Sequence, residues 1–168
     1  MTIAGELTAA EIRANLIARV LARRRLGHLI AGRPRRHDLV SFHTAHKFTL
    51  LAHSPTMYGE LGRLVARIRR ATFDQQVREY GRVFMAALST PATRPRHVNV
   101  LQHAAGHTKL VLPVALRRDL ALTIAGYQTG ALPLIAPIRL LSHYIKAYHL
   151  EYLAKQSYFE PYLNEACC

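Results

Sequence analysis

Basic and imidazole side chains lie close together in the stretch that contains His43, Lys47 and His53. Because residues four and seven apart lie on one side of a helix, Arg36, His43 and Lys47 can share a face that contacts phosphate groups or bases. Histidines that form hydrogen bonds inside a helical bundle are the alternative. A metal pair at His43 and His46, or at His46 and His53, is disfavoured because no third, well-spaced ligand accompanies it.

A second cluster combines arginines with side chains that can read bases. Arg96, Asn99 and His103 follow one another at spacings of three and four residues, as on one helix face. Free amides at a helix N-terminus attract phosphate, and asparagine or glutamine can bond base edges. A polar network that ties this helix to its neighbours is the alternative. The cluster consists of Arg94, Arg96, His97, Asn99, Gln102 and His103.

The last third of the chain is rich in aromatic residues. Aromatic rings near a basic surface can stack on unpaired bases. This region is close to neutral, however, and a tyrosine-rich helix face more often belongs to a hydrophobic core. The residues concerned are Tyr127, His143, Tyr144, Tyr148, Tyr152, Gln156, Tyr158 and Phe159.

The chain is strongly basic, with a net charge of +13 at pH 7 and a pI of about 10.6. Most of its 23 basic residues are arginines, whose planar fork of donors matches phosphate and stacks on bases. Residues 1–118 carry 20 bases and 6 acids, whereas residues 119–168 carry 3 bases and 4 acids. A pI above about 9 is typical of nucleic-acid binding. We therefore expect a polyanion to contact the first two thirds of the chain, including Arg63, Arg67 and Arg70.

Several classes of protein are disfavoured. The sequence has no glycine-rich phosphate loop, nucleophile elbow or His-Glu-x-x-His motif, so an enzyme is not expected, although a histidine could act as a general base. Cys167 and Cys168 are adjacent and cannot hold a zinc ribbon or an iron–sulfur cluster, and we expect no cofactor and no metal. No apolar run approaches the roughly 18 residues of a membrane span, and no signal peptide is recognised, which predicts a cytoplasmic protein without a membrane partner.

The spacing of apolar residues predicts an all-α fold, a compact bundle of seven or eight helices that forms one domain over residues 1–168. Residues 1–36 would form a basic N-terminal helix and loop. Gly130 is the expected end of the sixth helix. The expected helices cover residues 8–30, 37–53, 55–70, 72–90, 95–112, 114–129, a seventh that includes 140–145, and 152–156.

Three helix starts can be assigned from capping residues. Thr8 with Glu11, and Thr72 with Gln75, have the spacing of capping boxes. Ser54 precedes a proline, a pattern that favours a helix beginning at that proline.

Five stretches carry a resemblance to a known family. They are SFHTAHKFTLLAHSPTMYGELGRLVA (41–66), YGRVFMAAL (80–88), ATRPRHVNVLQHAAGH (92–107), YQTGALPLIAPIRLLSHYIKAY (127–148) and YLAKQSYFEPY (152–162). They resemble the YbgA-like domains and cover roughly residues 38–162, the family core. The resemblance implies an all-helical domain that occurs alone or behind a cysteine-bearing domain similar to a tRNA 4-thiouridine desulfidase. In such fusions the YbgA-like part would recognise tRNA.

The resemblance therefore implies an RNA-binding module that recognises tRNA in 4-thiouridine metabolism. Its partners would be tRNA and a desulfidase or another nucleic-acid-modifying enzyme, since this chain lacks cluster-ligating cysteines. Two alternatives remain: an enzyme or subunit with a pocket at His43, His97 and His103 that acts on a small molecule or modified nucleoside, or a partner-binding scaffold that uses the aromatic last third. The residues carried over from the family are His43, Lys47, His53, Arg94, Arg96, His97, Asn99, Gln102 and His103.

Overall fold

The computed structural model describes residues 9–163, apart from the side chains of Arg70 and Leu163. The expected cap at Thr8 and the pair Cys167 and Cys168 lie outside this range. All regular structure in the described part is helical, which confirms the all-α prediction. The α-helices are α1 (Ala9–Ala31), α2 (Arg36–Ala45), α3 (Lys47–His53), α4 (Pro55–Ala66), α5 (Phe73–Ala87), α6 (Arg94–Gly106), α7 (Val114–Thr129), α8 (Ile135–Ala147), α9 (Glu151–Ala154) and α10 (Glu160–Leu163). Short 3-10 turns at Arg70–Thr72 (η1) and Ser157–Phe159 (η2) complete the list.

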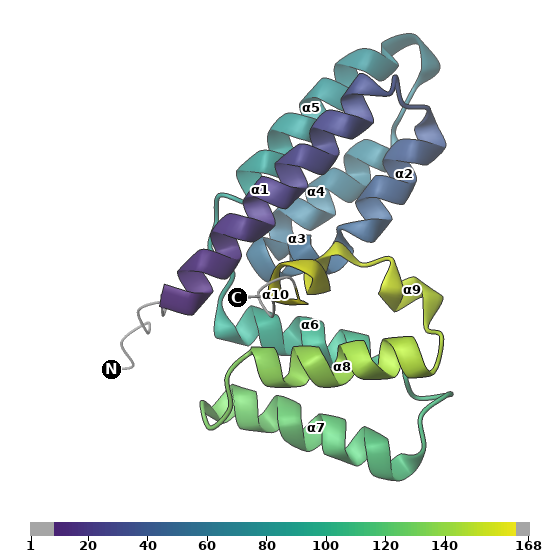
Figure 1. Cartoon of the computed structure of the whole chain (residues 1–168). Coiled ribbons are helices and arrows are strands. Elements are labelled where there is room, and N and C mark those ends of the chain that lie inside the picture. Colours follow the sequence, from purple (N-terminus) through teal and green to yellow (C-terminus); the bar gives the residue numbers. More distant parts are fainter. Residues whose placement is uncertain (1–8, 164–168) are drawn as a thin grey trace.

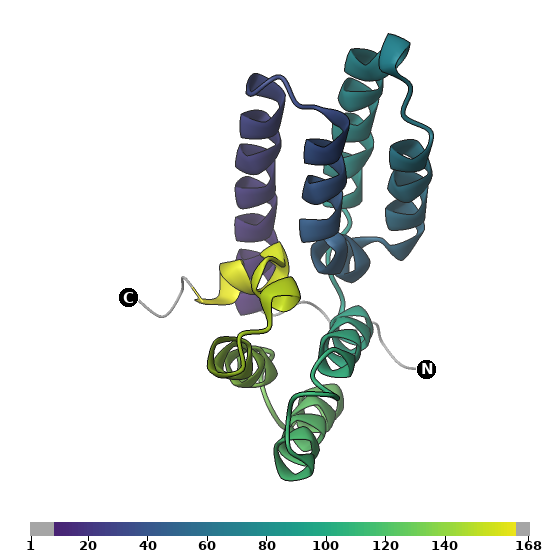
Figure 2. The same cartoon turned by 90° about the vertical axis from the view of Figure 1, so that its right-hand side faces the viewer.

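The helices form two groups that meet at α3 and at the C-terminal segment. Helices α1, α2, α4 and α5 lie side by side in an upper bundle, and α6, α7 and α8 lie below it (Figure 1). In the view of Figure 2 the lower helices are seen nearly end-on while those of the upper bundle run along the page, so the two groups cross steeply. No helix in the described range has the length and apolar character needed to cross a bilayer.

Each group of helices buries its own cluster of apolar side chains. Tyr80 and Phe84 of α5 are fully buried in the upper cluster, and Leu141 of α8 is fully buried in the lower one. Helix α3 contributes to both, because Leu50 packs in the upper cluster and Phe48 in the lower. This short helix therefore joins the two cores.

Two helix boundaries follow from the capping residues that the sequence indicated. The Ser54 hydroxyl oxygen accepts a hydrogen bond from the backbone N–H of Met57 at 3.4 Å, and Pro55 occupies the first turn of α4, as predicted. Gly130 ends α7 with a φ of +86°, a left-handed conformation that glycine adopts without strain. The predicted start of α4 and the predicted end of α7 are thus confirmed.

Two local predictions are wrong. The helix expected over residues 37–53 is interrupted at His46, because α2 packs into the upper cluster while Phe48 of α3 packs into the lower one. Thr72 makes no side-chain cap at the start of α5. The Gln76 amide orders the preceding loop instead, since its oxygen accepts from the Arg69 N–H at 2.8 Å and its nitrogen donates to the Arg67 carbonyl at 3.1 Å.

The segment 150–163 packs between α1, α2 and α8 (Figure 2). The Gln156 amide nitrogen donates to the Thr44 carbonyl at 2.9 Å, and the hydroxyls of Thr49 and Ser157 lie 2.9 Å apart. Residues separated by more than a hundred positions in the sequence are thereby held together.

Candidate nucleic-acid interface

Two loops at the far end of the upper bundle bring arginines together. The connection between α1 and α2 and the connection between α4 and α5 face each other across a hollow of about 800 Å³, which Arg35, Arg36 and Arg78 help to line. Arg33, Arg35, Arg67 and Arg69 in these connections are exposed, as are Arg36 at the start of α2 and Arg78 on α5. We call this group the basic tip: Arg33, Arg35, Arg36, Arg67, Arg69 and Arg78.

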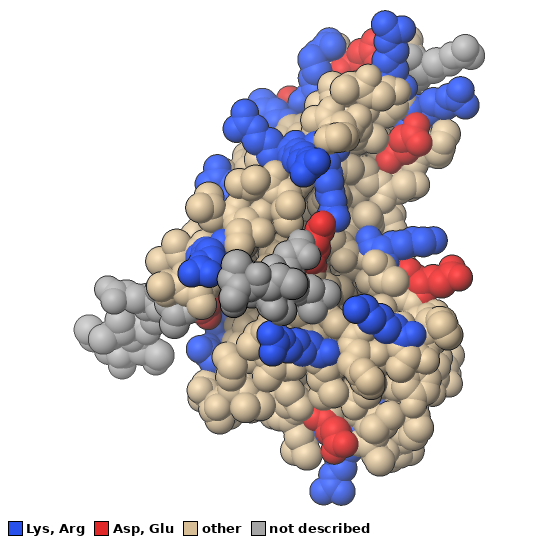
Figure 3. All heavy atoms as spheres, viewed as in Figure 1, with Lys and Arg blue, Asp and Glu red and all other residues tan. Residues whose placement is uncertain are grey.

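The guanidinium groups of the basic tip are not neutralised by carboxylates. Among the described residues, carboxylates form ion pairs with the side chains of two arginines, Arg25 and Arg82, which lie outside the tip. Asp38 accepts a hydrogen bond at 2.8 Å from the backbone N–H of Arg35. Figure 3 shows several Lys and Arg side chains at the upper end of the molecule and others spread along the same face. The tip therefore keeps its donors available to an external anion.

The arginines at the start of α6 are largely occupied within the protein. Arg94 donates to the Tyr127 carbonyl at 2.7 Å and lies 4.9 Å from the centre of the Tyr127 ring. Arg96 donates to the His53 carbonyl at 2.6 Å. Both side chains are half-buried and connect α6 to neighbouring segments, as the polar-network interpretation expects.

His97 lies in the core, while three other members of this cluster face solvent. Its Nδ1 and the Tyr158 hydroxyl are 2.7 Å apart, and burial lowers the pKa of His97 to about 3. Asn99, Gln102 and His103 are exposed on α6. A nucleic acid could reach these three side chains, but not His97.

The break at His46 divides the face predicted for α2 and α3. Arg36 lies at the start of α2 in the basic tip, whereas Lys47 follows the break and is half-buried. Between them, the His43 ring is stacked on Tyr58 with centroids 5.1 Å apart, and its Nδ1 is 3.1 Å from the Tyr80 hydroxyl. Burial lowers the pKa of His43.

The other predicted residues of this region have different surroundings. His53 is buried, and its Nδ1–H donates to the Thr90 carbonyl at 2.7 Å, which fits the structural interpretation of that histidine. Arg63 and Arg67 are exposed near the end of α4. Nothing is described of the Arg70 side chain, so its predicted contact stays a prediction.

The histidines do not form a common site. His97 is in the core and His103 is exposed, whereas His43 is half-buried against Tyr58 and Tyr80. Within residues 9–163, no three His, Cys, Asp or Glu side chains are placed to hold a metal ion.

The aromatic residues of the last third belong mainly to the core. Tyr127, Tyr144, Tyr158 and Phe159 are buried, whereas Tyr148 and Tyr152 are half-buried. His143 is exposed. The buried members cannot stack on a base without rearrangement of the fold.

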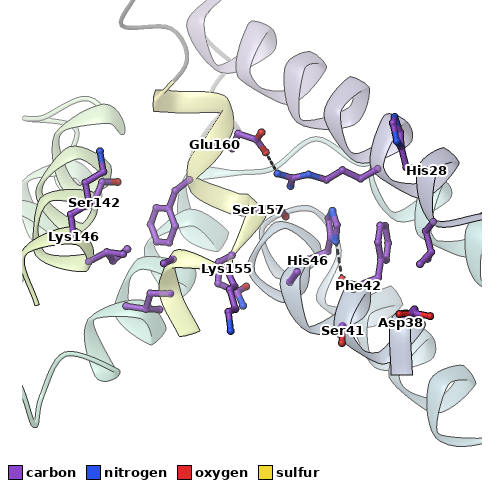
Figure 4. A pocket seen from close by; sticks show the side chains of 18 residues that line it. His28, Asp38, Ser41, Phe42, His46, Ser142, Lys146, Lys155, Ser157 and Glu160 are labelled. Atoms are coloured by element: carbon purple, nitrogen blue, oxygen red, sulfur yellow. Dashed lines mark hydrogen bonds and ion pairs between the residues drawn. The ribbon is translucent and has the colours of Figure 1, made fainter. Parts of the chain in front are cut away.

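A large cavity that the sequence did not indicate lies between α1, α2, α8 and the C-terminal segment. Its volume is about 820 Å³. In Figure 4, Ser41 and Phe42 on α2, with His46 just after it, face Lys155, Ser157 and Glu160 of the C-terminal segment, and Lys146 extends from α8. No local motif could reveal this site, because its walls come from residues 25–46 and 142–160.

The family relationship agrees with the helical fold. The model of DUF1722, a family of proteins of unknown function, matches residues 47–162. The chain belongs to the YbgA-like family. The uncharacterized protein YbgA of Escherichia coli (strain K12) is 35% identical over 126 residues, which cover 74% of this chain and 75% of YbgA. No solved structure matches the chain.

The YbgA-like match places the two candidate surfaces differently. It includes α6, whose exposed side chains were predicted to contact RNA, and the cavity walls on α8 and the C-terminal segment. It begins after the loop that carries Arg33, Arg35 and Arg36, so half of the basic tip lies outside the matched residues.

Proposed function

We propose that this YbgA-like domain binds structured RNA, with tRNA as the first candidate, and that the basic tip contacts the phosphate backbone. The observation that supports this proposal is the group of exposed arginines at one end of the upper bundle, of which Arg35, Arg36 and Arg78 line one hollow and none is paired with a carboxylate among the described residues. Arginine donates two parallel hydrogen bonds to a phosphate, and each phosphate that is neutralised releases counterions.

Local recognition would come from the exposed side chains of α6. Asn99 and Gln102 carry amide groups that can bond base edges, and His103 lies on the same exposed part of the helix. Arg94 and Arg96 would support this surface from within, since their guanidinium groups bond to backbone carbonyls. The α6 contacts are secondary to those of the tip.

The link to 4-thiouridine metabolism rests on the family resemblance. In this proposal the domain would hold tRNA in the cytoplasm for a partner that carries the sulfur chemistry, a cysteine-bearing desulfidase or a related modifying enzyme. This chain would supply affinity and orientation for the RNA.

Charge reversal at the tip tests the proposal. We expect Arg36→Glu with Arg69→Glu to weaken binding of fluorescent tRNA at least about tenfold and to reduce the slope of log K against log salt by roughly 2, or 0.9 for each lost phosphate contact. Anisotropy titrations at several salt concentrations measure both quantities, with duplex DNA and heparin as competitors. The matched control is Arg118→Glu with Arg139→Glu, which changes the net charge equally at exposed positions outside the tip.

The two double variants separate a localised interface from a general effect of charge. A larger loss of affinity in the tip variant supports the proposal. Equal losses in both variants, or tRNA affinity no greater than heparin affinity in the unaltered protein, would contradict it.

A further inference from the structure

One buried nitrogen in the large cavity lacks a protein partner. His46 is 2% exposed, and its Nδ1–H donates to the Phe42 carbonyl at 2.8 Å. This hydrogen bond places the proton on Nδ1, which leaves Nε2 as an acceptor. Among the described residues Nε2 has no hydrogen-bond partner, although it is buried. Nε2 has almost no exposed surface, so an N–H or O–H group of a ligand would satisfy it only after a small displacement of the side chains that cover the ring.

The other polar groups deep in the cavity are already bonded within the protein. Gln156 bonds with the backbone of Thr44 and Phe48, and the Ser157 hydroxyl pairs with Thr49. The Ser142 hydroxyl donates to the carbonyl four residues earlier. His46 Nε2 is therefore the acceptor that distinguishes this cavity from a simple packing gap.

The remaining lining of the cavity is apolar in its interior and basic at its opening. Ile145, Leu153 and Phe159 supply apolar surface that would cover the faces of a flat ring. The exposed Lys146 and Lys155 stand at the opening, and no carboxylate among the described residues pairs with them.

The acidic groups of the cavity are engaged elsewhere. Glu160 forms an ion pair with Arg25, and Asp38 bonds to the Arg35 backbone and contacts the His37 ring at 3.1 Å. His28 adds a further imidazole to the lining. With Asp38 still charged, the three basic side chains Arg25, Lys146 and Lys155 exceed the two carboxylates of the lining by one unit, which suits an anionic group.

We propose that the cavity binds a single nucleotide, whose base donates an N–H to His46 Nε2 and whose phosphate lies at Lys146 and Lys155. A nucleobase combines apolar faces with N–H donors on its edge, and the cavity volume of about 820 Å³ is within the range of roughly 300–1,000 Å³ typical of small-molecule sites. The nucleotide is either a free nucleoside monophosphate or an unpaired nucleotide of RNA. The second source rests on the proposed function, and the first does not.

The test combines mononucleotides with a variant that closes the cavity. Ser41 lines the cavity and is exposed, so Ser41→Trp would obstruct it with no change of charge. The control is Val40→Trp at the adjacent exposed position of α2, which does not line the cavity. Calorimetric titrations use UMP, CMP, AMP and GMP, with uridine and inorganic phosphate as partial ligands. Fluorescent tRNA is titrated in parallel.

We expect at least one arm of the experiment to show binding that Ser41→Trp weakens at least tenfold and Val40→Trp leaves unchanged. Monophosphate binding with this pattern supports the free source, and tRNA binding with this pattern supports the RNA source. Lys146→Gln with Lys155→Gln should reduce monophosphate affinity about tenfold and leave thermal unfolding unchanged, because both side chains are exposed.

The proposal is overturned if no monophosphate binds and the two tryptophan variants bind tRNA equally well. It is also overturned if monophosphates bind but the two tryptophan variants do not differ. The tip variant Arg36→Glu with Arg69→Glu should not alter monophosphate affinity. If the unaltered protein binds monophosphates but not tRNA, the proposed function fails and the nucleotide-binding cavity stands. If it binds tRNA but shows no binding that depends on the cavity, the cavity proposal alone fails.

Discussion

Burial, more than residue type, decides what each histidine of this protein can do. His46 and His97 are almost completely buried, and burial lowers the pKa of His46 to about 4 and that of His97 to about 3. Both are therefore neutral at physiological pH and act as hydrogen-bonding groups. His103, six residues after His97, is exposed and remains available to a ligand.

Because of these two histidines, we expect the free energy of unfolding to decrease in mild acid. In the unfolded chain they bind protons below a pH of about 6.5, whereas the folded protein resists protonation until pH 3–4, so their contribution is complete above pH 6.5 and is lost as the pH falls. Between pH 7 and pH 5 we expect the free energy of unfolding to decrease by about 2 kcal/mol for each histidine. Urea denaturation at the two pH values measures this.

A non-titrating substitution provides the control for the pH effect. His97→Gln can still bond to the Tyr158 hydroxyl but binds no proton, so it should remove the His97 share of the pH dependence. A free energy of unfolding that is the same at pH 7 and pH 5 would contradict the assignment of two neutral buried histidines.

For single residues, the sequence predicted the candidate regions better than it predicted the contacts that each side chain makes. Residue types and spacing singled out Arg36, Arg67 and the exposed side chains of α6, but they could not reveal that Arg94 and Arg96 bond to backbone carbonyls. Residue type alone does not distinguish an arginine that is available to a ligand from one that is bonded within the protein. The position of His46 beside lysines a hundred residues away follows only from the folded chain.

Helix ends are the elements that local sequence predicts best, because the capping interactions are themselves local. Ser54 with Pro55 starts α4 and Gly130 ends α7, as expected. The break at His46 and the missing cap at Thr72 were not predicted. The break depends on the two cores, which distant segments build, whereas the loop before α5 is held by the nearby Gln76 amide in a contact that is not a helix cap.

Two glycines at contrasting places predict opposite effects of alanine. Gly130 has a φ of +86°, a conformation that a side chain strains, so Gly130→Ala should destabilise the protein by about 1–2 kcal/mol. Gly27 lies inside α1 with open space at its Cβ, so Gly27→Ala should stabilise it by about 0.5–1 kcal/mol. Urea midpoints measure both, and a shift of the same sign in the two variants would contradict the helix-end assignment.

On the scale of the whole molecule, the two buried clusters are coupled through α3. Phe48 and Leu50, two residues apart, are both fully buried but in different clusters. The C-terminal segment adds a second connection, through Gln156 and Ser157 to α2 and α3. The length of the chain predicts a single domain over residues 1–168. If that prediction is right, the two clusters are coupled strongly enough to unfold together.

Truncation of Phe48 tests that coupling. We expect Phe48→Ala to cost about 3–5 kcal/mol and to accelerate amide hydrogen exchange in α5 of the upper bundle as well as in α8 of the lower group, because α3 supports both. Leu122→Ala, at an exposed site on α7, should change little. Faster exchange confined to α6, α7 and α8 would show two independently unfolding units.

The ion pair between Arg25 and Glu160 joins the two ends of the chain, so it can form only late in synthesis. The cavity joins residues 25–46 to residues 142–160, so translation supplies its first wall long before its second. At about 5–20 residues per second, the nascent chain would expose the unfinished wall for several seconds. The upper bundle can therefore fold while the chain is still on the ribosome. The cavity wall that contains His46 cannot be covered by the C-terminal segment until residue 160 has left the exit tunnel.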